Sequence, residues 1–286
     1  MENGGGGEHR PWMYDDETVS IYRKFAKAHH RMSPYLHTMG ANAMDSGSST
    51  LKPLADRHQA LSGMDIQYPE PKVFVYRLGD DILVNPILRS SDSNLTSVEI
   101  RDAVFPTIDN KNTVWLSWWH PTDTKMAQVV DAHEGQKRVV MVIPLDSYPV
   151  HVRRGALLPL ESTENAAKTV FTWFCPDISA MENDSKHPKT AILRESESTG
   201  SGMLATAYIS ANSSIEVTIS ARPGPVGFEI VGVTKPSDVL IESGVTGVCV
   251  HEYITFTESV LVSCKDNSRG THITVTDVAS SLKFDL

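Results

Sequence analysis

Large side chains in the first fifty residues recur at the spacing of one helical face. Asp15, Asp16 and Glu17 precede this stretch and suit a helix start, because carboxylates accept hydrogen bonds from first-turn N–H groups. Pro34 lies inside the pattern and predicts a kink or a break, and Gly47 with its neighbouring serines ends it. The pattern predicts a helical segment with one face formed by Tyr22, Phe25, His29, Met32 and Leu36.

From about residue 70 onward the pattern changes to short apolar runs. Clusters of Asp, Asn, Ser, Gly and Pro separate these runs, which is typical of strands joined by turns. Residues 161–168 are polar, which predicts a linker or surface loop. Residues 176–203 hold few large apolar side chains, which predicts a long loop or a partly disordered segment. Strands are predicted around residues 73–77, 82–84, 98–100, 114–116, 139–143, 150–153, 170–174, 204–208, 215–219, 228–233, 239–241, 248–250, 253–256, 260–262 and 273–275.

This order of elements predicts an α+β or mostly β fold, with two β-sandwich domains preceded by a helical segment. The net charge of −9 argues against a nucleic-acid surface, which needs a basic field, and is compatible with a neutral partner such as a sugar. No apolar run reaches the roughly 18 residues that span a bilayer, so no membrane span is expected. The first residues also lack the apolar core of a signal peptide, and the localisation stays open.

The three cysteines show no CxxC spacing, so the sequence contains no metal or redox motif built on cysteine. Cys249 and Cys264 could pair across a hairpin. The preferred interpretation is that Cys175, Cys249 and Cys264 are all small buried apolar residues. The disulfide state of the three stays undecided at the level of sequence.

One segment carries a family signature. Residues 144–160, from Pro144 to Leu160, resemble the pattern PLDxxPVxxRxGxxxP, which closes a β-sandwich of glycoside hydrolase family 31. The local chemistry agrees, because Val150 and Val152 alternate with polar residues as in a strand and Gly155 permits a turn.

Further motifs of the same family follow in the expected order. Residues 3–12 resemble the loop after the last strand of the family's barrel, and residues 22–36 resemble its last helix. Residues 47–54 resemble GxPVxRPL, with Lys52 where Arg is usual, and residues 78–86 resemble GDxLLVAPV. The tryptophan-rich hairpin of the family has its counterpart in Phe105, Pro106, Trp115, Trp118 and Trp119.

The resemblance implies a three-part organisation. Residues 1–68 would be the remnant of a (β/α)8 barrel, a loop plus its last helix; residues 69–162 a proximal β-sandwich; and residues 163–286 a distal β-sandwich. Family members are α-glycosidases and related enzymes, many of them secreted or endomembrane proteins. The chain therefore resembles the C-terminal part of an α-glucosidase-like enzyme of carbohydrate metabolism, with Met1 expected to be an internal methionine of a longer chain.

The same resemblance bears on activity. Retaining family members use an Asp nucleophile and a carboxylic general acid on upstream barrel strands, and on this alignment neither falls within the chain. No catalytic residue, metal ligand or cofactor is therefore assigned, and the chain is expected to be inactive alone. A different class of function stays open, namely a non-catalytic carbohydrate-binding or interaction module.

Two sets of residues are weak candidates for sugar contact. His9 and Trp12 lie in the loop that the resemblance places at the barrel mouth, although they could equally anchor the following helix. Trp115, Trp118 and Trp119 could stack on pyranose faces, or they could pack as aromatic pairs of a hairpin.

The remaining candidates have simpler explanations. Asp15, Asp16 and Glu17 are explained by helix capping, and Asp80 and Asp81 by a turn before a buried strand. His29 and His30 are adjacent on a helix and point apart, which disfavours a metal site with His37. The expected partners are carbohydrate, bound through the parent enzyme, and a second copy of the chain, through the exposed helix face that lacks its barrel.

Overall fold

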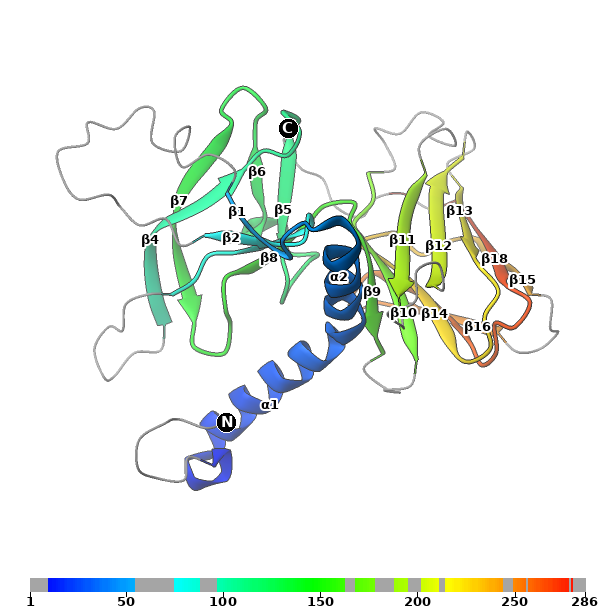
Figure 1. The fold of residues 1–286 in the computed structure, drawn as a ribbon, viewed down its shortest axis with the longest axis horizontal. Helices are drawn as coiled ribbons and strands as arrows, with labels where there is room; N and C mark the ends of the chain where they lie inside the picture. The colour runs from blue at the N-terminus through cyan, green and yellow to red at the C-terminus, as the bar shows by residue number, and fades with distance from the viewer. Residues whose placement is uncertain are drawn as a thin grey trace.

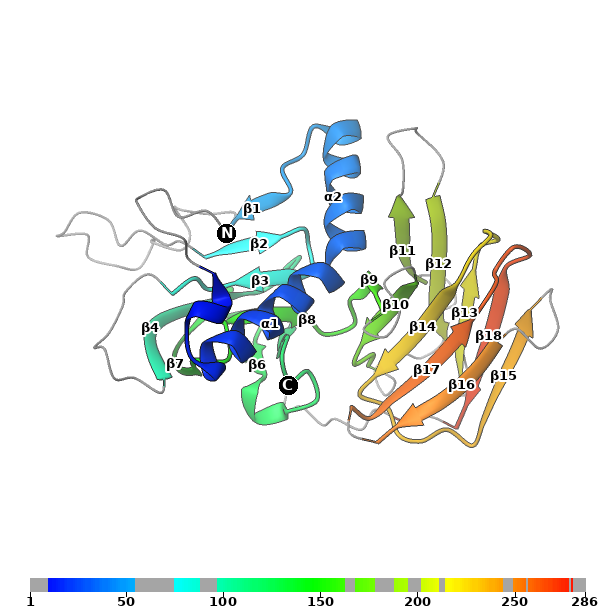
Figure 2. The same ribbon diagram turned by 90° about the horizontal axis from the view of Figure 1, so that it is seen from below.

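The computed structural model describes residues 10–54, 75–87, 97–162, 168–177, 188–194, 202–210, 214–243, 249–255, 257–277 and 279. In this part of the chain two α-helices precede eighteen strands, so the fold is mostly β, as predicted. Figures 1 and 2 show the arrangement from two directions: the second helix stands between two β units, the earlier strands on one side and the later strands on the other. No helix among these residues is long and apolar enough to cross a membrane.

The helical segment consists of two helices with a break at Met32. Helix α1 (Asp16–Arg31) begins at the N-cap Asp15, whose carboxylate accepts a 2.7 Å hydrogen bond from the Thr18 N–H. Helix α2 (Ser33–Ser46) carries Pro34 in its first turn, where a missing N–H is tolerated, so the predicted break is confirmed. Gly47 ends α2 in the left-handed conformation at φ +69°. A short 3-10 turn, η1 (Pro11–Met13), precedes α1.

The first β unit is a sheet with a two-stranded layer packed on one face. Its six strands lie in the order β1-β2-β3-β8-β5-β6, and the second layer pairs β4 with β7. Leu83, Phe105 and Trp115 are fully buried between the two layers. A second core covers the opposite face of the sheet, where α2 packs. The strands are β1 (Leu51–Pro53), β2 (Tyr76–Leu78), β3 (Ile82–Val84), β4 (Ser97–Pro106), β5 (Thr113–Ser117), β6 (Gln128–Val130), β7 (Gln136–Pro144) and β8 (Val150–Arg153), with a 3-10 turn η2 (Thr124–Met126).

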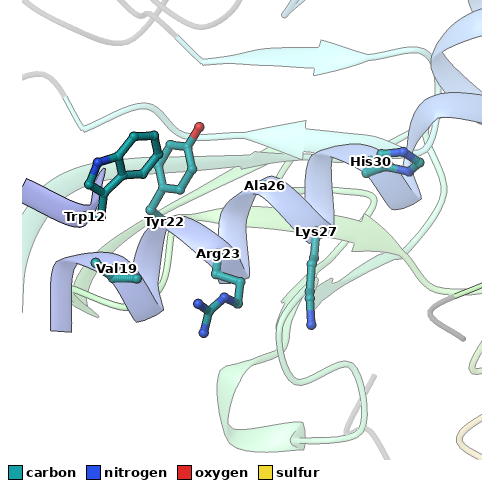
Figure 3. Close-up of a pocket in the computed structure, with 7 residues that line it drawn as sticks. All are labelled: Trp12, Val19, Tyr22, Arg23, Ala26, Lys27 and His30. Atoms are coloured by element: carbon teal, nitrogen blue, oxygen red, sulfur yellow. The ribbon is translucent and has the colours of Figure 1, made fainter. Parts of the chain in front are cut away.

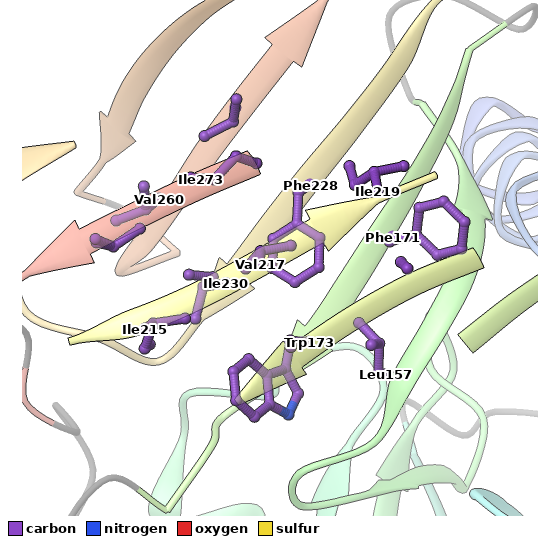
Figure 4. Close-up of a cluster of buried hydrophobic side chains, with 14 of the residues drawn as sticks. Leu157, Phe171, Trp173, Ile215, Val217, Ile219, Phe228, Ile230, Val260 and Ile273 are labelled. Atoms are coloured by element: carbon purple, nitrogen blue, oxygen red, sulfur yellow. The ribbon is translucent and has the colours of Figure 1, made fainter. Parts of the chain in front are cut away.

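The second β unit is a sandwich of two five-stranded sheets. One sheet has the order β16-β17-β14-β10-β9 and the other β11-β12-β13-β18-β15. Figure 4 shows the core between them, where aromatic and branched side chains of both sheets meet. The strands are β9 (Leu157–Glu161), β10 (Thr169–Phe174), β11 (Lys189–Arg194), β12 (Gly202–Ile209), β13 (Ile215–Ile219), β14 (Val226–Val231), β15 (Asp238–Ser243), β16 (Cys249–Ile254), β17 (Ser259–Cys264) and β18 (Thr271–Thr276).

Hydrogen-bonded strand pairs cross both domain boundaries that were predicted from the sequence, at residues 68/69 and 162/163. The division into three domains stays a prediction. Strand β1, at residues 51–53, pairs with β2 of the first sheet. Strand β9, at residues 157–161, pairs with β10 of the second sandwich. The signature segment that ends the first unit therefore also begins the second.

One predicted loop is wrong in part. Residues 189–194 lie within the expected loop 176–203, yet they form β11, paired along its whole length with β12. Ala191 and Leu193 point into the core while Thr190 and Ile192 are exposed, a period-two pattern too short to stand out in a polar stretch. The adjoining residues 178–187 and 195–201 lie outside the described part of the chain.

The cysteines divide into a pair and a single thiol. Cys249 and Cys264 face each other on β16 and β17 and form a disulfide, so the preferred interpretation of three unpaired residues is wrong for these two. Cys175 is free and fully buried, and burial raises the pKa of its thiol to about 12. The disulfide fastens β16, which lies at the edge of its sheet, to the neighbouring strand.

Candidate functional site

The family-like signature forms the passage between the two β units. At the end of β8, Nε of Arg153 donates to Oδ1 of Asp81 at 2.8 Å. Nη1 of Arg154 donates to Oδ2 of Asp177 at 3.0 Å, and its Nε donates to the Cys175 carbonyl. Gly155 then turns at φ +76°, as its position in the pattern predicts. The consecutive arginines thus tie the passage to a turn on each side.

The turn between β2 and β3 is the contact point for α2. Gly79 has φ +66°, and Tyr35 of α2 donates its hydroxyl to the Leu78 carbonyl at 3.0 Å. Burial, with the Asp81 and Asp80 carboxylates adding to it, raises the pKa of Tyr35, so the hydroxyl keeps the proton that it donates. The turn therefore fits closely beneath the helix.

Both acidic residues of that turn have cationic partners. Asp80 binds Nζ of Lys52 at 2.7 Å, and Asp81 binds Arg153. Lys52 occupies the position where the family pattern has Arg, and it supplies the same charge. This pairing supports the structural interpretation of Asp80 and Asp81.

Trp119 fixes α1 on the first β unit. Its ring makes an edge contact with Phe25 at a centroid distance of 5.0 Å, and Lys24 Nζ lies 5.1 Å from the ring centroid. Its indole N–H donates to the Tyr148 carbonyl at 2.6 Å. Lys24 also binds Asp146 at 2.8 Å, and this partner together with hydrogen bonding lowers the pKa of the Asp146 carboxyl. The ring is therefore engaged by the protein's own helix.

The second β unit contacts the chain where α1 ends and α2 begins. His30 pairs with Glu161, which is buried at the end of β9, and Arg31 binds Glu229 of β14 at 3.3 Å. On α2, the Thr38 hydroxyl accepts the Arg194 N–H of β11 at 3.1 Å. The helices therefore contact both β units.

The three tryptophans proposed for sugar stacking do not form one platform. Trp115 has no exposed surface and donates its indole N–H to the Pro106 carbonyl at 2.8 Å, so the prediction that its ring face meets a sugar is wrong. Trp118 is half-buried and packs against Phe174 at 5.9 Å. Trp118 and Trp119 are both partly exposed, and for these two residues sugar stacking stays a prediction.

Trp12 is the one described member of the other candidate pair, since His9 lies outside the described residues. Its ring is 70% exposed and lies beside the Arg10 guanidinium, 5.7 Å from the ring centroid. Figure 3 shows that it borders a groove along α1. The groove has an apolar floor flanked by cationic side chains and is lined by Trp12, Val19, Tyr22, Arg23, Ala26, Lys27 and His30.

The groove shows that the predicted helix face needs correction. The sequence predicted one exposed face for the whole set, but only Tyr22 and His29 are exposed. Phe25, Met32 and Leu36 pack against the β units instead. The reason is that α1 carries apolar side chains on two sides about 120° apart, and only one side meets the β units. The spacing of Val19, Tyr22 and Ala26 was the signal that could have revealed the second side.

The histidines of the helices contact separate groups. His30 binds Glu161, while His37 donates to the Arg194 carbonyl at 2.7 Å. Within the described ranges, no cluster of three or more His, Cys, Asp or Glu side chains could hold a metal ion.

A second depression lies on the later sandwich, where β15 approaches β16. Its walls combine a half-buried tyrosine with exposed polar and charged side chains. Burial raises the pKa of Tyr253, and its hydroxyl donates to the Val233 carbonyl at 3.2 Å. The lining residues are Lys235, Pro236, Ser237, Asp238, Val239, His251, Glu252 and Tyr253.

Removal of the Trp119 ring is expected to loosen α1. In Trp119→Ala, hydrogen exchange of α1 amides should speed up about 30-fold, equivalent to about 2 kcal/mol, because the edge contact with Phe25 is lost. Exchange in β12 and β13 should not change. Trp12→Ala is the matched control, since the Trp12 ring is exposed. Equal exchange in the two variants would show that Trp119 does not hold the helix.

Comparisons with known proteins place these features in context. Residues 60–158 match the family model described as "Glycosyl hydrolase family 31 C-terminal domain". The chain is 25% identical over 175 residues to an alpha-glucosidase of Mucor javanicus, covering 59% of this chain and 17% of that protein. It is 23% identical over 150 residues to an alpha-xylosidase of Saccharolobus solfataricus, covering 52% and 17%. The match therefore spans less than a fifth of either relative.

Solved structures share the fold over nearly the whole chain. A GH31 dextranase of Flavobacterium johnsoniae, complexed with isomaltotriose, matches 96% of this chain and 34% of its own, with a TM-score of 0.66 and 15% identity. A cycloalternan-forming enzyme of Listeria monocytogenes, in complex with a pentasaccharide substrate, matches 96% and 26%, with a TM-score of 0.67 and 17% identity. The helical segment and both β units thus recur together as one arrangement.

Proposed function

Because this chain carries the C-terminal part of glycoside hydrolase family 31, we propose that it is the non-catalytic support region of an α-glycosidase. The observation that carries this proposal is the placement of α1 and α2, which are fastened to both β units. Trp119 and Gly79 contact the helices from the first unit, and Glu161, Glu229 and Arg194 contact them from the second. A rigid base of this kind suits the end of a barrel that carries the catalytic groups.

Charge pairing supports the absence of hydrolysis by this chain alone. A retaining glycosidase needs two carboxyl groups about 5 Å apart, one of them free to attack the sugar. Near the helices, Asp81 is bound by Arg153, Glu161 by His30 and Glu229 by Arg31. These carboxylates serve structural ion pairs instead of forming a catalytic pair.

The relatives suggest the substrate class of the complete protein. The curated relatives are an alpha-xylosidase and alpha-glucosidases, so we assign to the parent enzyme the hydrolysis of α-linked glycosides. Mass measurement of the native protein tests this step. The intact mass is expected to correspond to a protein several hundred residues longer than these 286 residues. A native protein of 31.5 kDa would contradict the existence of a longer parent enzyme.

Activity of the isolated chain is the direct test. With p-nitrophenyl α-glucoside and α-xyloside, release of nitrophenol is expected to equal that of buffer, and an intact family 31 α-glucosidase serves as the positive control. Turnover by the purified chain that disappears in Asp80→Asn or Asp81→Asn would refute the support role and identify the adjacent carboxylates as catalytic.

The distal depression favours a second function, carbohydrate binding without catalysis. Tyr253 offers an aromatic surface, and His251 and Glu252 are exposed beside it to hydrogen-bond hydroxyl groups. An oligosaccharide panel screened by calorimetry tests this function. If a ligand binds, the double variant His251→Ala/Glu252→Ala should weaken binding, whereas His133→Ala in the first β unit should not. No binding across the panel removes this second function.

A further inference from the structure

The outer face of one sheet in the second β unit carries a group of polar side chains. Figure 4 shows Val217 on β13 and Ile273 on β18 in the core between the two sheets. Because the side chains of a strand alternate between its two faces, the residues next to them point outward. Glu216 and Thr218 therefore lie on the outer face of β13, and His272 lies on the outer face of β18.

Three of these side chains form one hydrogen-bonded chain. Thr218 and His272 are directly opposite each other in the β13–β18 ladder, and 3.1 Å separates Thr218 Oγ1 from His272 Nδ1. The other ring nitrogen, Nε2, lies 3.1 Å from Oε2 of Glu216. A carboxylate only accepts hydrogen bonds, so Nε2 of the neutral ring carries the proton. Nδ1 then offers a lone pair, and the Thr218 hydroxyl donates to it.

This chain is held at its carboxylate end and open at its hydroxyl end. Thr274 donates its hydroxyl to Oε2 of Glu216 at 2.8 Å, and Ser214 donates to Oε1 at 3.4 Å. The Glu216 side chain is 17% exposed and the His272 side chain 38%, whereas Thr218 is an exposed residue. The carboxylate thus orients the imidazole, and the imidazole meets a hydroxyl that faces solvent.

A hydroxyl, an imidazole and a carboxylate linked in this order are the parts of an activated oxygen nucleophile. The imidazole can take the hydroxyl proton, and the carboxylate holds the ring in the tautomer that allows the transfer. Thr206 on β12 is directly opposite Thr218, so their Cβ atoms are about 5 Å apart on the same face. Its hydroxyl is placed to donate to the oxygen of a carbonyl group that Thr218 attacks.

We propose that Thr218, His272 and Glu216 form an esterase site that hydrolyses small carboxylic esters. The Thr218 oxygen attacks the carbonyl carbon while its proton passes to Nδ1 of His272. The bond between this carbon and the alcohol oxygen breaks, the alcohol leaves with that proton, and the acyl group stays on Thr218. Water then attacks the acyl group by the same proton route, which releases the carboxylic acid and restores the hydroxyl.

The position of this site separates it from the contacts of the helices. These contacts reach β9, β14 and β11, through Glu161, Glu229 and Arg194. The esterase site lies on β12, β13 and β18 instead. The inference therefore does not depend on the glycosidase activity proposed for the parent enzyme, and it concerns a surface other than the distal depression.

Hydrolysis of p-nitrophenyl acetate by the full 286-residue chain tests the proposal. Thr218→Val and His272→Gln should each reduce the catalysed rate about a hundredfold, because each removes one partner of the proton transfer. Thr218→Ser should keep the rate, since the hydroxyl remains. Peptide mass spectrometry after an acid quench should find the acetyl group on Thr218.

Glu216 is a positioning residue in this proposal, so its variant needs a separate readout. Glu216→Gln should lower kcat about a hundredfold and leave KM within about twofold, because Glu216 does not touch the ester. The amide of the new side chain can donate to Nε2, which moves the ring proton to Nδ1 and blocks the transfer from Thr218. Thr206→Val should slow the reaction about tenfold, through loss of the donor to the carbonyl oxygen.

The matched control is Thr190→Val, which makes the same change on the same face of the sheet. Thr190 is exposed on β11, opposite Thr206 and two strands from Thr218. Its variant should keep the wild-type rate, and urea titration should show that both valine variants remain folded. Equal rates in the wild type and Thr218→Val would overturn the proposal. So would acetylation of other residues in place of Thr218, or an equal loss of rate in Thr190→Val.

Discussion

Replacing Gly79 by alanine is expected to lower the free energy of unfolding by about 3 to 4 kcal/mol. The residue has φ +66°, which costs about 1 kcal/mol for a side chain. A Cβ at this position would also lie 2.2 Å from the Tyr35 hydroxyl oxygen and 2.6 Å from the Met39 sulfur. Because Tyr35 and Met39 are buried on α2, their side chains have little room to turn aside, and relief of the clash is expected to break the Tyr35–Leu78 hydrogen bond or displace the helix.

Gly47→Ala is the matched control for this prediction. Gly47 has φ +69°, but no atom of the described residues lies within 4 Å of an added Cβ, so only the backbone strain of about 1 kcal/mol is expected. Urea titration of both variants measures the difference. In a Tyr35→Phe background, Gly79→Ala should lower the free energy of unfolding by about 1 kcal/mol less than in the wild-type chain, since the clashing oxygen is gone. Equal losses in Gly79→Ala and Gly47→Ala would show that the helix does not press on this turn.

Acid is expected to destabilise the protein through His151. This side chain is 2% exposed on β8 and meets Phe105 edge-on at 4.8 Å, and its Nδ1 has no hydrogen-bond partner among the residues that the structure describes. Burial lowers its pKa to about 4 from an ordinary value of 6.5. Above pH 6.5 both the folded and the unfolded chain hold it neutral, so it adds no pH dependence there.

Between pH 6.5 and 4 the unfolded chain takes up a proton that the folded chain rejects. The free energy of unfolding therefore falls as the pH falls, by up to about 3 kcal/mol for this group at pH 4. Chemical denaturation at several pH values measures this slope. His151→Leu should flatten that part of the curve, whereas His133→Gln, at an exposed position, should not. An unchanged slope in His151→Leu would assign the acid sensitivity to other groups.

The signature of residues 144–160 gains a physical explanation from the structure. Arg153 and Arg154 point to opposite sides of the passage, one to Asp81 in the first β unit and one to Asp177 beyond β10. Gly155 supplies the turn that lets β9 enter the second sandwich. The motif is thus a joint between two β units, and its charges serve to hold that joint.

Local features of the sequence predicted local structure well. The break near Pro34, the cap at Asp15 and the turns at Gly47 and Gly155 each follow from residues within one turn of the chain. The alternation of Ile215, Val217 and Ile219 likewise identified a strand of the second sandwich. Strand β11 was not predicted because only Ala191 and Leu193 point inward, too few to show an alternating pattern.

Taken by itself, the sequence determined the order of elements, the mostly β class and the resemblance to one family, because periodicity and turn chemistry act over a few residues. Only the tertiary structure decided which side of α1 is covered, since that depends on Trp119 and on Asp146, 122 residues from Lys24. The same holds for the burial of Trp115, the Cys249–Cys264 pairing and the Arg31–Glu229 contact across 198 residues. Such contacts form only when distant segments pack, and no local pattern encodes which partner each side chain will meet.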